Sequence, residues 1–404
     1  MAALGGSYRK LWTADGLSNV ADGMFQLALP LFALRITRSP AAIAGLAFAA
    51  RVPWLVLGVV SGTVADRLDR RTTMVRVDVA RAALIGALAI VVVLDRGELW
   101  LLYAVALALG AGETLFDTSS MALLPAIVQP DDLSRANSRL FAVEMGMNQF
   151  VGPPLAGLLA GVTISLAFTT SAAAYLAAAA ILLTLPGTFR ADAPGGVVER
   201  NRLRQDMAEG LRYLTQHRLL RTLTAMVGIS MLSSAAAISL LPVFSVAPGP
   251  LGLTEFQFGL LLTSAAAGSL VSSLVADRVE QRLGRQRVLL ICILTDGIAI
   301  AVLAVGVVPV AVAVGVALGF SQILWQVVTV TLRQRIVPNH LLGRVSGAHR
   351  TVALGSLSLG AAAGGALGEA FGIRVVFVAA GMATLSLLLL LPFVSDRALK
   401  DAPT

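Results

Sequence analysis

The sequence predicts an all-α membrane protein with twelve transmembrane helices in two pseudo-symmetric six-helix bundles. Hydrophobic residues make up 57% of its 404 residues and charged residues only 13%, about half of the roughly 25% that is usual in soluble proteins. Apolar stretches such as 163–185 reach the roughly 20 residues that a helix needs to cross a bilayer. Sequence landmarks also recur in the two halves at a nearly constant offset. The lipid bilayer is therefore the expected solvent.

Charged residues and Pro/Gly-rich breaks divide the apolar stretches into twelve predicted helices. These are residues 11–36, 40–65, 74–94, 99–126, 134–161, 163–186, 218–245, 255–276, 287–307, 309–334, 343–370 and 373–394. No small-residue cleavage site follows the first apolar stretch, so we expect it to remain as a span and not to be removed as a signal peptide.

The basic residues between these helices lie mostly on one side. The opposite side carries four of them: Arg35, Arg38, Arg96 and Arg374. Because Lys and Arg are retained in cytoplasmic loops, and an even number of spans returns the chain to the same side, both termini are predicted to be cytoplasmic. The same bias accounts for the net charge of +8. Basic residues are not interleaved with stacking aromatics, so nucleic acid is not an expected partner.

The longest segment between predicted helices, 187–217, divides the chain into an N-terminal bundle (1–186) and a C-terminal bundle (218–396), followed by a cytoplasmic tail (397–404). Apolar residues recur at helical spacing in the second part of this segment: Leu203, Met207, Leu211 and Leu214. The spacing predicts an amphipathic helix on the cytoplasmic membrane surface; a plain connector is the alternative.

The two halves repeat each other. GTVADRLDRR follows the second predicted helix and SLVADRVEQRLGRQR follows the eighth, so that Asp66 and Asp277 are 211 residues apart. Likewise Pro130 and Pro338, after the fourth and tenth helices, are 208 residues apart. Duplicated halves indicate a pseudo-two-fold assembly with a central site near the membrane midplane, as in secondary transporters.

The repeated loops contain the residues predicted to form a cytoplasmic gate. An Asp just beyond a span can accept hydrogen bonds at a helix N-terminus, and the arginines can pair with carboxylates on adjoining helix ends. Contacts of this kind can form in one conformation and break in another, although a purely topogenic charge is the alternative. The predicted gate residues are Gly62, Asp66, Arg67, Arg70, Arg71, Asp277 and Arg278.

Residues 62–71 resemble the signature loop of the major facilitator superfamily, G-x-x-x-D-R-x-G-R-R, with Asp69 where the family usually has Gly. GPPLAG at 152–157 is similar to the G-P-x-x-G-G motif of exporters in that superfamily, with Ala156 replacing a Gly. The resemblance covers nearly the whole chain and is closest to bacterial drug and siderophore exporters of the enterobactin and macrolide type. It implies the fold of that superfamily and a bacterial inner-membrane location.

The Gly-Pro segment of the fifth predicted helix permits close helix contact and a kink. The resemblance implies that this segment, with Gly152, Pro153 and Gly157, seals the transport path while the carrier faces inward. Ordinary tight packing is the competing interpretation.

Carboxylates inside predicted spans are the sharpest functional indicators, because a charge at the bilayer centre costs at least about 2.5 kcal/mol. Glu113 and Asp117 are four residues apart and share one face of a helix. Two acids so placed in a low dielectric resist ionising together, which suits a proton-coupling site. Arg51, near the middle of the second predicted helix, is expected to be a counter-charge. The predicted coupling and cavity residues are Asp22, Arg51, Glu113, Asp117, Glu144 and Asn148.

Each acid also has a structural interpretation. Asp22 can hydrogen-bond to a neighbouring helix, and Glu113 with Asp117 can form a fixed pair with an arginine. Glu144 fits a partner of the basic gate loops, and Asp296 is expected to be structural. The fourth helix lacks the Arg that proton-coupled members of the superfamily often carry there, so the prediction of proton coupling rests on the carboxylates.

Several chemistries lack the residues that they need. One cysteine and three scattered histidines (His217, His340 and His349) do not form a metal-ligand pattern. The two lysines, Lys10 and Lys400, lie at the termini, which excludes a phosphate-binding P-loop or a buried Schiff base in the membrane body. No G-x-S-x-G or H-E-x-x-H motif is present. Neither an enzyme nor a cofactor is expected.

The sequence thus predicts a secondary transporter, monomeric and coupled to protons, that exports small amphipathic compounds by alternating access. A non-transporting sensor or lipid-handling protein on the same scaffold is the alternative from another functional class, and an importer is the third hypothesis.

Overall fold

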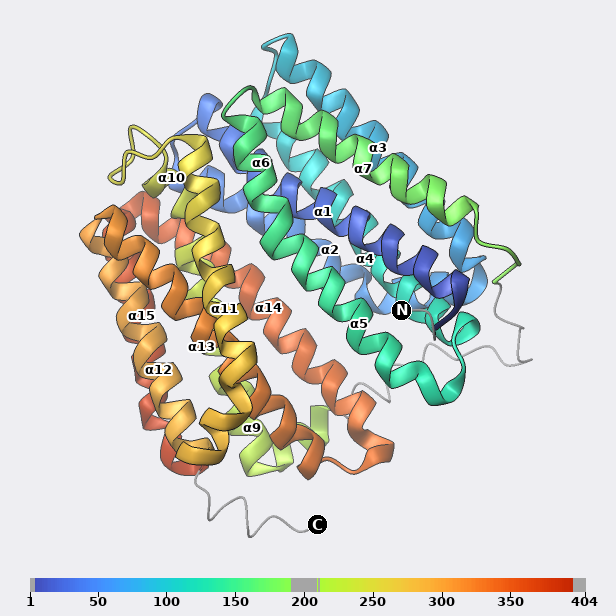
Figure 1. Cartoon of the computed structure of the whole chain (residues 1–404). Coiled ribbons are helices and arrows are strands. Elements are labelled where there is room, and N and C mark those ends of the chain that lie inside the picture. The colour runs from blue at the N-terminus through green and yellow to red at the C-terminus, as the bar shows by residue number, and fades with distance from the viewer. Residues whose placement is uncertain (1–3, 190–208, 210, 395–404) are drawn as a thin grey trace. The chain divides into compact units, whose positions relative to one another are not determined.

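The computed structural model describes residues 4–189, 209 and 211–394, with side chains except at 55–67, 134, 334–335, 339–340 and 342–344. Within these residues the chain is almost wholly helical and forms no β-strand (Figure 1). Helices occupy each of the twelve predicted spans.

The N-terminal half contains six spans, the fifth of which is interrupted. They are α1 (Gly5–Ile36), α2 (Pro40–Arg67), α3 (Arg70–Val93), α4 (Leu99–Ile127), α5 (Leu133–Met145) continued by η3 (Gly146–Val151) and α6 (Gly152–Ala160), and α7 (Ile164–Leu183). A short turn, η2 (Pro130–Asp132), precedes α5.

The C-terminal half repeats this order. Its spans are α9 (Arg218–Ile238) with α10 (Leu241–Ser245), α11 (Glu255–Leu283), α12 (Arg285–Val302) with η4 (Leu303–Val305), α13 (Val308–Ile336), α14 (Asn339–Phe371), and α15 (Ile373–Leu385) with η5 (Ser386–Leu389) and η6 (Leu391–Val394).

Eight helices in the described part of the chain are long and apolar enough to cross a membrane. Several helices extend beyond the predicted ends: α1 starts at Gly5 and not at residue 11, and α11 reaches Leu283 and not residue 276. The added turns are polar, so apolar stretches alone do not reveal them. A helix continues past the hydrocarbon region as long as its backbone hydrogen bonds continue.

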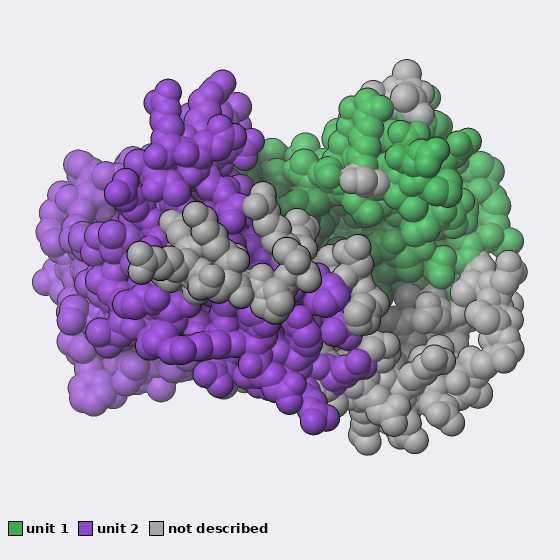
Figure 2. Space-filling model, turned by 90° about the horizontal axis from the view of Figure 1, so that it is seen from below, with its two compact units in different colours: residues 1–38, 46–194, 252–263 green, residues 39–45, 195–251, 264–404 purple. Residues whose placement is uncertain are grey.

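The chain divides into two compact units, coloured separately in Figure 2. The first contains residues 1–38, 46–194 and 252–263, and the second contains residues 39–45, 195–251 and 264–404. The short segment that begins α2 therefore groups with the second unit, and the beginning of α11 groups with the first.

In the first unit α1 is the most enclosed helix, packed against α4, α5, α6 and α7. Its contact with the fifth span depends on glycine. A Cβ atom on Gly23 would lie 2.1 Å from the backbone oxygen of Asn148, and one on Gly152 would lie 2.7 Å from the Cα of Gly23. The hydrophobic effect does not drive helices together in lipid. Van der Waals contact between closely approaching backbones therefore supplies the packing energy.

The fifth span changes its hydrogen-bonding pattern just before Pro153. A π-helical turn at Gly146–Val151 joins α5 to α6. Proline lacks the N–H that would continue the helix, and π-turns of this kind are a recognised cause of helix kinks. The predicted Gly-Pro segment thus begins α6 directly after a π-turn, and its Gly152 contacts α1.

In the second unit α9 packs on α14, and α12 packs on α13 and α15. Glycine again permits close approach: a Cβ on Gly381 of α15 would lie 2.5 Å from the backbone oxygen of Gly297 of α12. The predicted amphipathic helix within 187–217 lies mostly outside the described residues. Residues 211–216 are helical, with Leu211 exposed and Leu214 buried in a cluster with Leu220 and Leu341.

Candidate functional site

Polar side chains gather in the middle of the first unit, around an ion pair between α1 and α3. Arg81 pairs with Asp22, and both side chains are almost fully buried. The hydroxyl of Tyr175 on α7 donates to the same carboxyl oxygen at 2.7 Å, and the guanidinium lies 4.3 Å from the centre of the Tyr175 ring. Asp22 therefore joins three helices and is held by two donors.

Arg81 also connects to a second carboxyl group on its own helix. Its Nη1 lies 3.5 Å from Asp78 and 3.3 Å from the hydroxyl of Ser18, which in turn donates to Asp78 at 3.1 Å. Asp78 is fully buried, and its second oxygen has no hydrogen-bond partner among the described residues. One arginine therefore balances two buried acids.

A separate set of acids, here called the acid group, consists of Asp15 on α1, Asp117 on α4 and Glu144 on α5. Asp15 is 3% exposed and accepts a hydrogen bond from Ser120 on α4 at 3.0 Å. Its other oxygen is buried without a hydrogen-bond partner in the described part of the chain. The carboxyl groups of Asp117 and Glu144 lie within electrostatic range of Asp15, and of each other.

Glu113, one turn before Asp117 on α4, faces α2. It interacts electrostatically with Arg51 and accepts a hydrogen bond from Trp54, both on α2. Arg51 also donates to the backbone oxygen of Ala47 at 3.2 Å. Glu113 also interacts electrostatically with Arg81, as does Asp117, so both arginines act on the α4 acids in this conformation.

The charges within this cluster do not balance. It brings together six acids: Asp15, Asp22, Asp78, Glu113, Asp117 and Glu144. Among the described residues the balancing arginines are Arg81 and Arg51, with Arg139 near Tyr8 at the edge of the cluster. An unpaired charge in a low dielectric is costly. A surplus of acids over arginines favours the binding of a proton or a cation at such a cluster.

The structure brings five of the six predicted cavity residues into this linked cluster, and the sixth, Asn148, accepts a hydrogen bond from Gln26 at 3.5 Å. Glu144 lies within electrostatic range of Asp15 and Asp117. The sequence interpretation missed four residues: Asp15, Asp78, Arg81 and Tyr175. The sequence could have indicated Asp15, because it lies seven residues before Asp22 and therefore on the same face of α1.

The predicted gate loop begins α3 with a well-formed cap. Asp69 accepts hydrogen bonds from the backbone N and the hydroxyl of Thr72, both at 2.8 Å, and from the backbone N of Phe189 at 2.6 Å. Partial burial alone would raise the pKa of the Asp69 carboxyl, but these hydrogen bonds and nearby Arg71 outweigh burial and lower the pKa. Its φ of −65° requires no glycine, which explains how Asp replaces the usual Gly.

The gate arginines that can be placed bind backbone oxygens, where carboxylates were expected. Arg70 donates to Ala122 near the end of α4 at 2.9 Å, and Arg71 donates to Leu185 just beyond α7. Cations suit helix C-terminal ends because carbonyl oxygens are exposed there. In the second half Asp277 and Arg278 are exposed. The side chains of Asp66 and Arg67, and the surroundings of Gly62, lie outside what the structure describes.

The second unit contains one further intramembrane acid, Asp296 on α12. It accepts a hydrogen bond from Ser321 on α13, and its Oδ1 has no hydrogen-bond partner in the described ranges. No group of three or more His, Cys, Asp or Glu residues among the described side chains is arranged to hold a metal ion.

Comparison with known proteins identifies the scaffold. Residues 4–402 match the sequence profile of a family described as transmembrane secretion effector, part of the major facilitator superfamily. The chain is 28% identical over 393 residues to YfiS, an uncharacterised MFS-type transporter of Bacillus subtilis, covering 92% of this chain and 89% of that protein. It is 29% identical over 385 residues to Tap, a multidrug efflux pump of Mycobacterium tuberculosis, covering 90% and 87%.

Solved structures share the fold at low sequence identity. The nucleoside transporter NupG is similar with a TM-score of 0.76 and 13% identity, covering 96% of this chain and all of that one. A bacterial homologue of the lysosomal transporter Spinster, solved in an inward-facing and occupied conformation, is similar with a TM-score of 0.76 and 14% identity over 99% of each chain. The predicted fold class is confirmed. The chain belongs to the transmembrane secretion effector family of the major facilitator superfamily and is a multi-pass membrane transporter, not an enzyme.

Proposed function

We propose that this transporter exports small amphipathic compounds from a bacterial cell in exchange for protons. The observation that carries the proposal is the acid group, in which three carboxyl groups from α1, α4 and α5 lie within electrostatic range of one another, and Asp15 keeps one buried oxygen without a hydrogen-bond partner among the described residues. The similarity to Tap, a multidrug efflux pump, supports the direction of transport.

The acid group can exchange a proton for a cationic or polar substrate group. When all three carboxyl groups are ionised, their mutual repulsion in a low dielectric favours binding of a positive charge. A proton and a cationic substrate both reduce this repulsion, so the binding of one displaces the other. Alternate binding of the two on opposite sides of the membrane converts a proton gradient into substrate export.

Asp22 takes a different role in this proposal from that of the acid group. It is held by Arg81 and by Tyr175, so we assign it to positioning α1 against α3 and α7. We assign the pair of Glu113 on α4 and Arg51 on α2 to linking these two helices. Because Glu113 interacts electrostatically with both Arg51 and Asp117, a change in the charge of Asp117 alters the interaction at this pair.

The Gly-Pro segment acts as a seal in the same proposal. Within the first unit Gly157 meets the beginning of α11: a Cβ on Gly157 would lie 2.8 Å from the Cα of Gly259. Two glycines at one crossing permit backbone contact that excludes water and ions. The gate loops on the other side, with Arg70 and Arg71 on helix ends, would open and close the cytoplasmic entrance.

Location and assembly follow from the same reasoning. We place the protein in the cell membrane with both termini in the cytoplasm, following the distribution of Lys and Arg. The interactions assigned to coupling lie within one unit of one chain, which supports a monomer as the working unit.

Transport into inverted membrane vesicles tests the proposal. With an acidic interior, vesicles that contain the protein should accumulate cationic dyes, and Asp15→Asn combined with Asp117→Asn should reduce the accumulation at least tenfold. Asp131→Asn makes the same chemical change at an exposed loop residue and should leave accumulation unaltered. Undiminished accumulation in the double variant would remove the acid group from the mechanism.

The same measurement separates the alternatives. An importer would deplete the vesicles of dye under the same gradient, and a sensor or lipid-handling protein would cause no gradient-dependent dye movement in either direction.

A further inference from the structure

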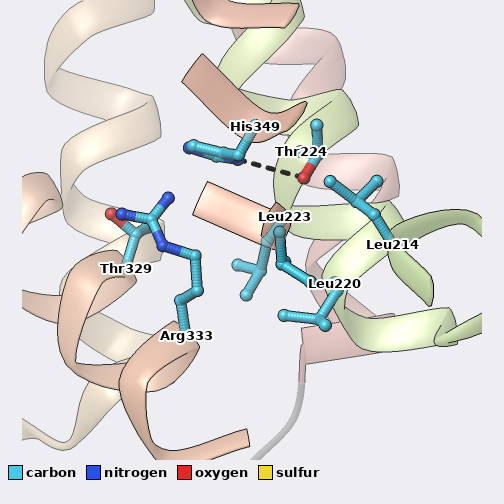
Figure 3. Close-up of a pocket in the computed structure, with 8 residues that line it drawn as sticks. Leu214, Leu220, Leu223, Thr224, Thr329, Arg333 and His349 are labelled. Atoms are coloured by element: carbon cyan, nitrogen blue, oxygen red, sulfur yellow. Dashed lines mark hydrogen bonds between the residues drawn. The ribbon is translucent and has the colours of Figure 1, made fainter. Parts of the chain in front are cut away.

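A small pocket in the second unit lies between α9, α13 and α14, and basic and hydroxyl side chains line one side of it (Figure 3). Its polar lining consists of Thr224, Thr329, Arg333 and His349. Its apolar lining consists of Leu214, Leu220, Leu223 and Val345. The pocket has room for one polar group and not for a whole substrate molecule.

The polar groups of the pocket are oriented by the protein. The hydroxyl of Thr224 and the Nδ1 of His349 share a hydrogen bond of 3.1 Å. When Thr224 donates in this bond, the neutral imidazole carries its hydrogen on Nε2 and can donate it to a ligand. Thr329 donates its own hydroxyl hydrogen to the backbone oxygen of Trp325 at 2.8 Å.

Arg333 gives the pocket its charge. Its guanidinium points toward Thr329 and His349 (Figure 3), and it forms no hydrogen bond or ion pair with any residue that the structure describes. It lies close enough to His349 for the two to interact electrostatically. A partly buried positive charge beside an uncharged imidazole donor favours an anion as the ligand.

The position of the pocket in the repeat makes it a counterpart of the acid group. Thr224 and Thr329 follow Asp15 and Ser120 by 209 residues each, within the offset of 208 to 211 shown by the repeated loops. Asp15 and Ser120 are hydrogen-bonded at the acid group of the first unit. The hydroxyls of Thr224 and Thr329 therefore stand where the first half has Asp15 and Ser120, whereas Arg333 and His349 stand where it has Leu124 and Leu140.

We propose that this pocket binds the single anionic group, a carboxylate or a phosphate, of an amphipathic molecule. Arg333 would hold two oxygens of the group in a bidentate contact, and His349 would donate to a third oxygen or share one. The leucines and Val345 would contact the first carbons of the apolar part. This site goes beyond the proposed function, because proton coupling in the first unit does not require it.

Calorimetric titration of the purified full-length protein in a neutral detergent tests the site, with decyl phosphate, inorganic phosphate and decyltrimethylammonium as probes. Decyl phosphate should bind, and Arg333→Gln should weaken its binding about tenfold to a hundredfold through the loss of charge-assisted hydrogen bonds. The matched control is Arg221→Gln, which removes an exposed arginine from α9 and should change binding less than twofold.

Further arms distinguish the source of the anionic group. Anionic phospholipid retained by the protein in native mass spectrometry, and lost from Arg333→Gln, would assign the site to a lipid headgroup. Binding of decyl phosphate without any retained lipid would assign it to a soluble amphiphile. Either result supports the site. Since no gradient is applied, failure here would leave the exporter proposal standing, and failure of gradient-driven transport would leave this site standing.

Three results would overturn the proposal. The first is equal binding of decyl phosphate by Arg333→Gln and Arg221→Gln. The second is equally tight binding of decyltrimethylammonium, and the third is binding of inorganic phosphate as tight as that of decyl phosphate. If Arg333→Gln fails to fold, His349→Gln provides the same comparison, with a threefold to tenfold weakening expected.

Discussion

At the scale of single residues, Arg81 is the side chain on which the first unit depends most. It is 2% exposed, pairs with Asp22 and Asp78, and lies against the ring of Tyr175. A buried ion pair adds little net stability by itself, but removing one partner leaves the other charge buried and unpaired. Replacing Arg81 should therefore destabilise the fold by more than the net stabilisation that its ion pairs provide.

Replacing Arg81 by Gln should lower the stability of the protein by about 3–5 kcal/mol, because Asp22 and Asp78 then lose their counter-charge. The double variant Arg81→Gln with Asp22→Asn should recover part of that loss. Thermal unfolding in detergent measures both. A single variant as stable as the unaltered protein would contradict the role assigned to this pair.

Asp69 offers a test of pH dependence outside the membrane. Its folded-state pKa lies below the ordinary value, so its stabilisation is present above that ordinary value, near 4, and is lost as pH falls through the folded-state pKa. Asp69→Ala should therefore cost about 0.5–2 kcal/mol at pH 7 through loss of the helix cap. The difference from the unaltered protein should shrink in unfolding measurements below pH 4.

At the scale of helices, the crossing of α1 with the kinked fifth span shows how backbone contact positions the site. Gly23 and Gly152 touch directly, and this crossing places the η3 turn beside the α1 residues that follow Asp15 and Asp22. The separation of the two helix axes is thus set by glycine and not by large side chains.

Two glycine-to-alanine substitutions in the fifth span should differ in their effect on stability. Gly152→Ala places a methyl group 2.7 Å from the Cα of Gly23, where only backbone movement can relieve the clash. It should cost about 1–3 kcal/mol and reduce transport. Gly146→Ala meets no atom within 4 Å and should be neutral. Similar unfolding temperatures for the two variants would argue against glycine packing as the cause.

At the scale of the whole molecule, the two halves share an architecture but differ in chemistry. The first unit concentrates buried acids around Arg81, whereas the second has Asp296 beside Ser321 and the basic pocket at Arg333 and His349. The repeated architecture thus carries different charges in its two halves.

The orientation of the whole chain can be measured with its single cysteine removed. In a Cys292→Ser background, Lys400→Cys should react with a membrane-impermeant maleimide only in inverted vesicles, because the tail is predicted to be cytoplasmic. Arg96→Cys should react only in intact cells. Labelling of both positions from the same side would refute the predicted topology.

The sequence by itself determined the class of protein, the twelve spans, the internal repeat and the family resemblance. These properties are local or repeated along the chain: apolar stretches long enough to cross a bilayer, charged breaks between them, and motifs such as 62–71. It also identified Glu113 and Asp117 as neighbours, because residues four apart always share a helix face.

Only the tertiary structure decided which charges meet. Arg81 pairs with Asp22 across 59 residues, Tyr175 reaches Asp22 across 153, and Ser120 reaches Asp15 across 105. In a membrane helix the lipid-facing and buried sides are both apolar, so the sequence pattern does not show how each helix is rotated. The partners of the intramembrane charges are set by helix packing. The distinction between the two acids that pair with Arg81 and the acid group therefore became visible only in the folded chain.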